Sequence, residues 1–216
     1  LPQHAPHLLE TLRALHPQQR RFRTTLDARL QLAATDIVRE RAAALARQDV
    51  HNAAALVVDN RSFEALAYVG NAAWSLADER GLAVDIVRRA RSSGSILKPF
   101  LYAAMLDAGE ILPGTLIADV PTQYAGYAPE NFDHGYRGAV RADVALAHSL
   151  NVPAVRMLKE HGVQRFYDDL RRFGMTSLWR KPDEYGLTLI LGGAEATLFD
   201  VTGMYANLAD IARAGQ

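Results

Sequence analysis

Cysteine is absent from this chain of 216 residues, which excludes disulfide bonds and thiolate zinc sites. The formal net charge is zero, so there is no electrostatic case for binding nucleic acid or an anionic membrane surface. No run of residues is long and apolar enough to cross a bilayer. The remaining composition, 49% hydrophobic and 22% charged, is that of an ordinary globular protein, and nothing in it predicts a cofactor.

Lysine is scarce too, and one of only three lysines lies in the apolar stretch RSSGSILKPF, residues 91–100. Lys98 follows Ser95 by three residues, a spacing that puts two side chains on one face of a helix. A serine becomes nucleophilic when a base takes its proton, and a lysine whose pKa is lowered by burial can be that base. Roughly 0.1 chance occurrences of S-x-x-K are expected in a chain with this many serines and lysines.

A plainer explanation of the same stretch is a helix start, with Ser95 as the N-cap and the Lys98 amine reaching toward solvent. From this stretch alone, that structural interpretation is the favoured one.

A second polar pair occurs in HSLNVPAV, residues 148–155, where a helical pattern breaks. In an irregular segment Ser149 could relay a proton, and the Asn151 amide could bind a substrate amide with both its donor and its acceptor. Asn151 ahead of Val-Pro is equally typical of a helix N-cap with proline at the start of the next helix. Alone, this segment favours capping.

Hydrophobic spacing predicts more helix than strand. A helix is expected over 27–47, with Thr25 as a plausible N-cap, and an apolar helix is expected over 95–109. The other expected helices are two short ones separated by a break at 149–153, then 163–174 and 196–213.

Strands are expected only near the start. Apolar runs at 56–58 and 63–69, joined by Asp-Asn-Arg-Ser, predict a β-hairpin, and no confident strand follows residue 70. A lone hairpin is only marginally stable in water, which indicates that the rest of a sheet lies outside this chain.

The segment 118–140 is expected to be a long loop rich in glycine, proline and aromatic residues. Loops of this length are usually functional or disordered, and the aromatic side chains argue against disorder. The side chains that could line a cleft are Tyr124, Tyr127, Asn131 and Phe132. At the other end of the chain, His4 and His7 could suggest a metal pair, but a solvated linker is the better interpretation, and no metal site is predicted.

The two short motifs together change the balance, because S-x-x-K followed about 50 residues later by S-x-N supplies two of the three motifs of serine enzymes that act on penicillin-like substrates. Over nearly its whole length, the sequence resembles the transpeptidase domain of class A penicillin-binding proteins. The segments that carry the likeness are TTLDARLQ, GSILKPFLYAAMLDAG, YAPENFDHGYRGAVRADVALAHSLNVPAVRML and LILGGAEATLFDVTGMYANLA.

The resemblance implies an α/β (α+β) fold, with an antiparallel sheet flanked by helices beside an all-helical lobe. This chain would hold mainly the helices and one β-hairpin. Residues 1–23 would be a linker from a missing upstream domain, and residues 24–216 a partial transpeptidase domain.

The resemblance also implies roles. Ser95 matches the nucleophile that attacks the D-Ala–D-Ala amide of a peptidoglycan stem peptide, Lys98 the general base, and Ser149 the proton shuttle. Asn151 matches the residue that holds the substrate backbone, and Tyr127 and Asn131 are further candidates for substrate binding. An amine from a second stem peptide would resolve the acyl-enzyme, and β-lactams would acylate Ser95 by the same chemistry.

One family feature is missing: no K-T-G occurs, since Lys159 is followed by Glu and Lys181 by Pro. In relatives K-T-G follows the YANLA-like segment by several dozen residues. We therefore expect the chain to be truncated before this motif and to be inactive by itself.

The expected location is periplasmic, with membrane attachment only through a missing N-terminal anchor. The expected partners are stem peptides and β-lactams, with other cell-wall synthesis proteins as further candidates and no nucleic acid. Two alternatives stay open. One is a D,D-carboxypeptidase or β-lactamase-like hydrolase, and the other is a catalytically silent domain that binds murein or partner proteins.

Overall fold

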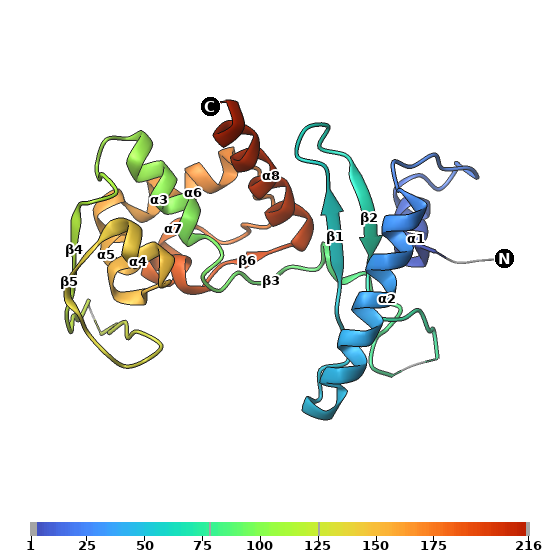
Figure 1. Cartoon of the computed structure of the whole chain (residues 1–216), viewed down its shortest axis with the longest axis horizontal. Helices are drawn as coiled ribbons and strands as arrows, with labels where there is room; N and C mark the ends of the chain where they lie inside the picture. Colours follow the sequence, from blue (N-terminus) through green and yellow to red (C-terminus); the bar gives the residue numbers. More distant parts are fainter. Residues whose placement is uncertain (1–3, 78, 125, 215–216) are drawn as a thin grey trace. The chain divides into compact units, whose positions relative to one another are not determined.

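The computed structural model describes residues 4–77, 79–124 and 126–214, and the chain divides into two compact units (Figure 1). One unit consists of Leu1–Ala90 with Thr197–Gln216, and the other of Arg91–Ala196. Among the described helices, none has the length and apolarity needed to cross a membrane. Each unit has buried apolar residues of its own.

The first unit combines a hairpin with helices from both ends of the chain. Its elements are α1 (Pro6–Leu15), α2 (Ala28–Leu45), η1 (Ala46–Gln48), β1 (Ala55–Val58), β2 (Ala65–Val69), η2 (Ile86–Arg88) and α8 (Leu198–Ala214). The predicted first long helix is confirmed as α2. Its predicted N-cap was wrong, because the Asp27 carboxylate accepts the first free N–H groups of the helix, whereas the Thr25 hydroxyl donates to the Ala65 carbonyl oxygen.

The predicted β-hairpin is also confirmed. Strands β1 and β2 pair antiparallel, with Ala55 opposite Val69. Asp59 closes the turn by accepting the backbone N–H groups of Arg61 and Ser62, each at 2.8 Å. Phe63 has a left-handed backbone with φ of 58°, so the return strand begins at Ala65, two residues later than predicted.

A side-chain amide ties α2 to the hairpin. Gln31 is buried, donates to the Tyr68 carbonyl oxygen at 3.0 Å and accepts the Tyr68 N–H at 2.7 Å. It therefore satisfies the backbone of β2 in the way that a neighbouring strand would. Apolar packing adds to this bond through Val38 and Ala42 of α2, which lie against Val69 in one buried cluster.

The second unit is mainly helical. Its elements are β3 (Arg91–Ser92), α3 (Lys98–Asp107), β4 (Leu116–Asp119), β5 (Gly138–Arg141), α4 (Ala142–Ala147), α5 (Asn151–His161), α6 (Val163–Arg172), α7 (Pro182–Tyr185), η3 (Gly186–Leu191) and β6 (Glu195–Ala196). Fully buried side chains from α3, α5, α6 and η3 form its core, including Phe100, Leu158, Phe166 and Leu189. This core holds the N-terminal ends of α3 and α5 in fixed positions.

The expectation of no strand after residue 70 was wrong. Strands β4 and β5 pair antiparallel from Leu116 opposite Arg141 to Asp119 opposite Gly138, and β3 pairs with β6. Each of these strands has four residues or fewer, too short for alternation to distinguish it from a loop. Most of the predicted long loop therefore connects β4 to β5. The predicted mixed fold, mainly helical with an antiparallel hairpin, is confirmed.

Candidate active site

Ser95 lies in a turn immediately before α3, not within the helix as predicted. The turn is closed by hydrogen bonds from Ile96 N–H to the Ser93 carbonyl oxygen at 3.2 Å and from Lys98 N–H to the Ser95 carbonyl oxygen at 3.1 Å. Gly94 has a φ of 54°, a conformation that glycine adopts at little cost. The Ser95 side chain is exposed, and its hydroxyl makes no hydrogen bond to any described residue. Its hydroxyl is thus accessible to solvent.

The segment 192–194 is hydrogen bonded to this turn. The Ser92 hydroxyl donates to the Gly192 carbonyl oxygen at 2.8 Å, and the Ser93 N–H donates to the Ala194 carbonyl oxygen at 2.9 Å. Gly192 has a φ of 103°, and a Cβ there would lie 2.6 Å from Ser92 Oγ and 2.9 Å from the Gly94 nitrogen. This tight packing fixes the turn that carries Ser95.

Lys98, the first residue of α3, is 2% exposed although it carries an amine. Its Nζ atom donates to three oxygens: the Ser149 carbonyl oxygen at 2.6 Å, Ser149 Oγ at 3.1 Å and Asn151 Oδ1 at 2.7 Å. An ammonium group has three donors, so all three are satisfied by these two residues. Sequence motifs that lie 51 and 53 residues apart therefore meet at one buried amine.

The loss of water around this amine changes its acidity. Burial disfavours the charged form and lowers the pKa of Lys98 to about 8. None of the three neighbouring oxygens belongs to a carboxylate. No full negative charge at these contacts therefore raises the pKa back toward the ordinary value of a lysine. At pH 7.5, a group with a pKa of about 8 is neutral in roughly a quarter of the molecules. Such an amine can accept a proton from a neighbouring hydroxyl.

Ser149 lies at the break between α4 and α5 with a φ of 51°. A non-glycine residue in this left-handed conformation costs about 1–2 kcal/mol, and it persists because the surrounding contacts impose it. The reversal of the chain here turns both the carbonyl oxygen and the hydroxyl of Ser149 toward Lys98. The predicted break at 149–153 is shorter in the structure, because α5 already begins at Asn151 and includes Pro153.

Asn151 is the first residue of α5, and its side chain is held on both sides. Its Oδ1 atom accepts from Lys98, and its Nδ2 atom donates to the Glu130 carbonyl oxygen at 2.8 Å. Its backbone N–H donates to Asn131 Oδ1 at 2.9 Å. The capping role considered for Asn151 belongs instead to the side chain of Asn131, from the loop between β4 and β5.

The two other predicted site residues lie in that loop. Asn131 is 2% exposed and hydrogen bonded within the protein. Tyr127 is half-buried, and burial raises the pKa of its phenol. Its backbone pairs with Tyr124, but no hydrogen bond between described residues joins its side chain to Lys98, Ser149 or Asn151.

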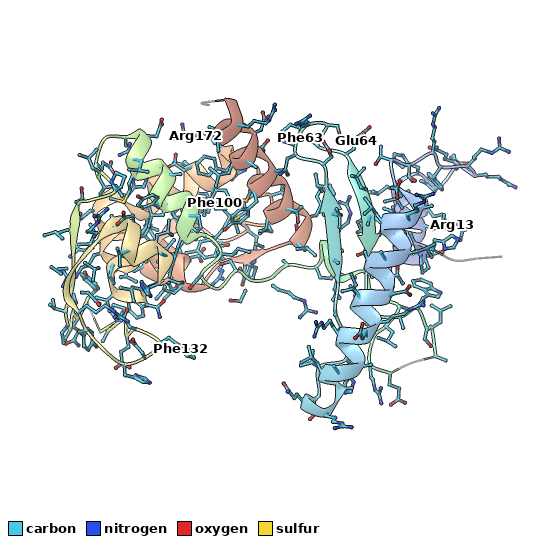
Figure 2. All side chains as sticks on the ribbon, viewed as in Figure 1. Arg13, Phe63, Glu64, Phe100, Phe132 and Arg172 are labelled. Atoms are coloured by element: carbon cyan, nitrogen blue, oxygen red, sulfur yellow. The ribbon has the colours of Figure 1, made fainter. Side chains whose placement is uncertain are left out.

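Phe132 follows Asn131 directly and is 98% exposed, on the outer side of the loop in Figure 2. The Asp119 carboxylate behind Asn131 is buried, although a solvated or capping acid was expected in this segment. In the described part of the chain, no cluster of three or more metal-ligating side chains occurs.

Comparison with known proteins adds a family context to this geometry. Residues 53–193 match the family described as "Penicillin binding protein transpeptidase domain". Penicillin-binding protein 1C of Escherichia coli strain K12 is 36% identical over all 216 residues, which make up 28% of that relative. Penicillin-binding protein 1F of Bacillus subtilis strain 168 is 29% identical over 81% of this chain and 23% of its own length. The chain thus spans about a quarter of the length of these relatives.

Solved structures agree on the fold. The penicillin-binding protein PonA1 of Mycobacterium tuberculosis aligns over 94% of this chain and 56% of its own, with a TM-score of 0.71 and 21% identity. The same protein in complex with penicillin V aligns over 96% of this chain and 57% of its own, with a TM-score of 0.69 and 22% identity. At these identities the likeness establishes the fold, which agrees with the predicted one.

Proposed function

The chain belongs to the family of penicillin-binding protein transpeptidase domains. From that membership we propose that it carries the residues of a peptidoglycan D,D-transpeptidase site that form the acyl-enzyme. The observation that supports this most directly is the buried Lys98 amine, held within 3.1 Å of Ser149 and Asn151 and close in sequence to an exposed Ser95. Buried amines with lowered pKa values are typical of catalytic bases.

In the proposed reaction, neutral Lys98 takes the proton of the Ser95 hydroxyl, and Ser95 Oγ attacks the carbonyl carbon of the penultimate D-Ala. The peptide C–N bond breaks, and the departing amine receives a proton relayed through the Ser149 hydroxyl. The terminal D-Ala leaves, and the donor peptide stays as an ester on Ser95. An amine from a second stem peptide then attacks the ester, which forms the cross-link and frees Ser95.

Asn151 has a supporting role in this proposal. Its Oδ1 atom orients the Lys98 amine in the resting site, and its amide is the candidate for binding the donor peptide backbone. Tyr127 remains a candidate for substrate contact.

The same attack on a strained lactam carbonyl would give a stable acyl-enzyme, so we propose that the protein binds β-lactams through Ser95. A relative with this fold, PonA1, has been solved in complex with penicillin V. By the same family membership, we propose an extracytoplasmic location and other cell-wall synthesis proteins as partners.

The K-T-G motif of the family does not occur in this sequence. In the family, this motif supplies the cation for the substrate carboxylate and half of the oxyanion hole. We therefore propose that the 216 residues alone do not turn over substrate, and the tests below use the intact encoded protein.

The proposal is tested by labelling the intact protein with a fluorescent penicillin, comparing the wild type with Ser95→Ala. The matched control is Ser93→Ala in the same turn, because the buried Ser93 hydroxyl has no hydrogen-bond partner among the described residues. We expect labelling of the wild type and the control and none of Ser95→Ala. Absence of a Ser95-dependent adduct would overturn the enzyme proposal. Release of D-Ala without cross-linked product would identify a carboxypeptidase instead.

A further inference from the structure

Beneath the proposed site, the Asn131 side chain caps helix α5 from outside the helix. Its Oδ1 atom accepts the backbone N–H groups of Asn151 at 2.9 Å and Val152 at 3.2 Å. These are the first two N–H groups of α5, and they have no partner within the helix. The residue before the helix is Leu150, whose apolar side chain cannot accept them. Asn131 therefore fixes where α5 begins.

The other side of the same amide is held by an acid. Asn131 Nδ2 donates to Asp119 Oδ1 at 2.7 Å and to the Gly135 carbonyl oxygen at 2.8 Å. Asp119 is 0% exposed, and its second oxygen accepts the Arg137 N–H at 3.0 Å, with the Arg137 guanidinium 3.7 Å away. Because a carboxylate accepts hydrogen bonds, the amide nitrogen must face Asp119 and the amide oxygen must face α5.

This arrangement leads directly to the proposed base. The residue that Asn131 caps is Asn151, whose Oδ1 atom holds Lys98 Nζ at 2.7 Å. The neighbour of Asn131 in the loop, Glu130, accepts the other end of the Asn151 side chain through its carbonyl oxygen. One loop thus fixes both the backbone and the side chain of Asn151. Every link from Asp119 to Lys98 is a hydrogen bond of 2.9 Å or less.

We propose that Asn131, oriented by Asp119, is a positioning residue that sets the acylation rate by holding Asn151 against Lys98. This inference rests on the proposed function and refines it. In this proposal Asn131 has a positioning role in place of the expected substrate contact. Both hydrogens of its amide nitrogen and both lone pairs of its oxygen are engaged within the protein.

The experiment is a double-mutant cycle on the intact protein, measured as the saturating rate constant and half-saturating concentration for acylation by a fluorescent penicillin. The variants are Asn131→Ala, Asn151→Ala and the double substitution. We expect Asn131→Ala to lower the saturating rate constant by about 10- to 100-fold, with a smaller effect on the half-saturating concentration. In the Asn151→Ala background, the same substitution should lower the rate constant by less than about threefold, because the residue through which it acts is already absent.

A matched control separates positioning from general loss of stability. Asn71 is another buried asparagine, 3% exposed, whose amide donates to three oxygens in the other unit of the chain. We expect Asn71→Ala to lower the melting temperature while the folded protein keeps the wild-type saturating rate constant. The positioning role is overturned if Asn131→Ala acylates as fast as the wild type. It is also overturned if Asn131→Ala lowers the saturating rate constant by the same factor in the Asn151→Ala background as in the wild type.

Two variants of nearly unchanged volume keep the test decisive if Asn131→Ala does not fold. Asn131→Asp retains an oxygen toward α5 but removes the donor to Asp119. Asp119→Asn removes the carboxylate that orients the amide. Each is expected to lower the saturating rate constant, and each loss should vanish in the Asn151→Ala background. Losses that persist there would count against the inference. A wild-type protein that forms no adduct would overturn the proposed function itself, an outcome distinct from a labelled wild type whose Asn131 variants behave normally.

Discussion

The Nζ atom of Lys98 lies 2.7 Å from Oδ1 of Asn151, a residue 53 positions further along the chain. The contact joins the first residue of α3 to the first residue of α5, so two helix starts meet at one buried amine. Burial lowers the pKa of this amine, and the oxygens around it orient its N–H groups.

The first prediction concerns pH. The base must be neutral to take the Ser95 proton, and the pKa of Lys98 is lowered to about 8. The acylation rate should therefore rise with pH, with a midpoint near 8 and a slope of about one proton, and then level off. Stopped-flow labelling between about pH 6 and 10, with circular dichroism to verify folding, measures this. A rate that stays flat across the range would exclude Lys98 as the titrating base.

The second prediction separates charge from basicity at Lys98. In Lys98→Arg the side chain stays cationic and can still donate hydrogen bonds, but a guanidinium does not deprotonate. Acylation should fall by about 100- to 10,000-fold, the usual size of a lost general base. The matched control is Lys159→Arg, because Lys159 is an exposed lysine of α5 that lies over the Tyr124 ring. Comparable losses in the two variants would show that the effect is not specific to the site.

The third prediction tests the packing of Gly192 against the turn that carries Ser95. Gly192→Ala would place a methyl group 2.6 Å from Ser92 Oγ and 2.9 Å from the Gly94 nitrogen, at a φ that disfavours alanine. We expect a stability loss of about 1–3 kcal/mol and slower acylation, because the turn that carries Ser95 must shift. Gly114→Ala is the control, since its added methyl group meets no atom within 4 Å. Denaturant unfolding and penicillin labelling measure the two effects, and equal behaviour of both variants would contradict the prediction.

The fourth prediction concerns the far end of α5. His161 is buried there, with one ring nitrogen 2.7 Å from Glu110 Oε2 and the other 2.9 Å from Asp169 Oδ2. Burial alone would raise the pKa of Asp169, but hydrogen bonds from His161 and Arg172 outweigh it, so the pKa lies below its ordinary value. Asp169 therefore contributes stability above its unfolded pKa, and this contribution is lost as the pH falls through the folded value.

At neutral pH, Asp169→Asn should reduce the free energy of unfolding by about 2–4 kcal/mol, because it leaves the buried His161 ring without its carboxylate partner. The control is Asp168→Asn, one position earlier on the exposed side of α6. The difference between the two variants should shrink as the pH is lowered toward the range where Asp169 itself titrates. Chemical denaturation at several pH values measures it, and a difference that does not change with pH would refute the assigned role.

The candidate site residues could be named from two short motifs together with the family resemblance, whereas each motif alone favoured helix capping. Ser95 and Lys98 are three residues apart, a helical spacing, whereas Ser149 and Asn151 meet through the distant Lys98 amine. What local spacing could not predict was the exact backbone. Ser95 lies in a turn before α3, and Ser149 has a left-handed φ, because contacts from segments far along the chain impose both conformations.

The strands β3 to β6 were missed for a related reason. Two to four residues give too little alternation to signal a strand, and their pairing depends on partners such as Arg91 and Ala196, which lie about a hundred residues apart. The burial of Asn131 was not predicted, because a polar residue in an aromatic loop is typical of a surface contact. Its burial depends on Asp119 and on the start of α5, which come together only in the folded unit.

By itself, the sequence determined the main helices and the hairpin, since periodicity is a property of neighbouring residues. Its resemblance to a known family over long segments indicated the family and the candidate nucleophile and base. Only the tertiary structure decided that Lys98 is buried against Ser149 and Asn151, that Gly192 braces the Ser95 turn, and that Asn131 lies beneath the site. Those facts depend on which segments, distant in the sequence, pack together and bury these side chains. Burial in turn lowers the pKa of Lys98.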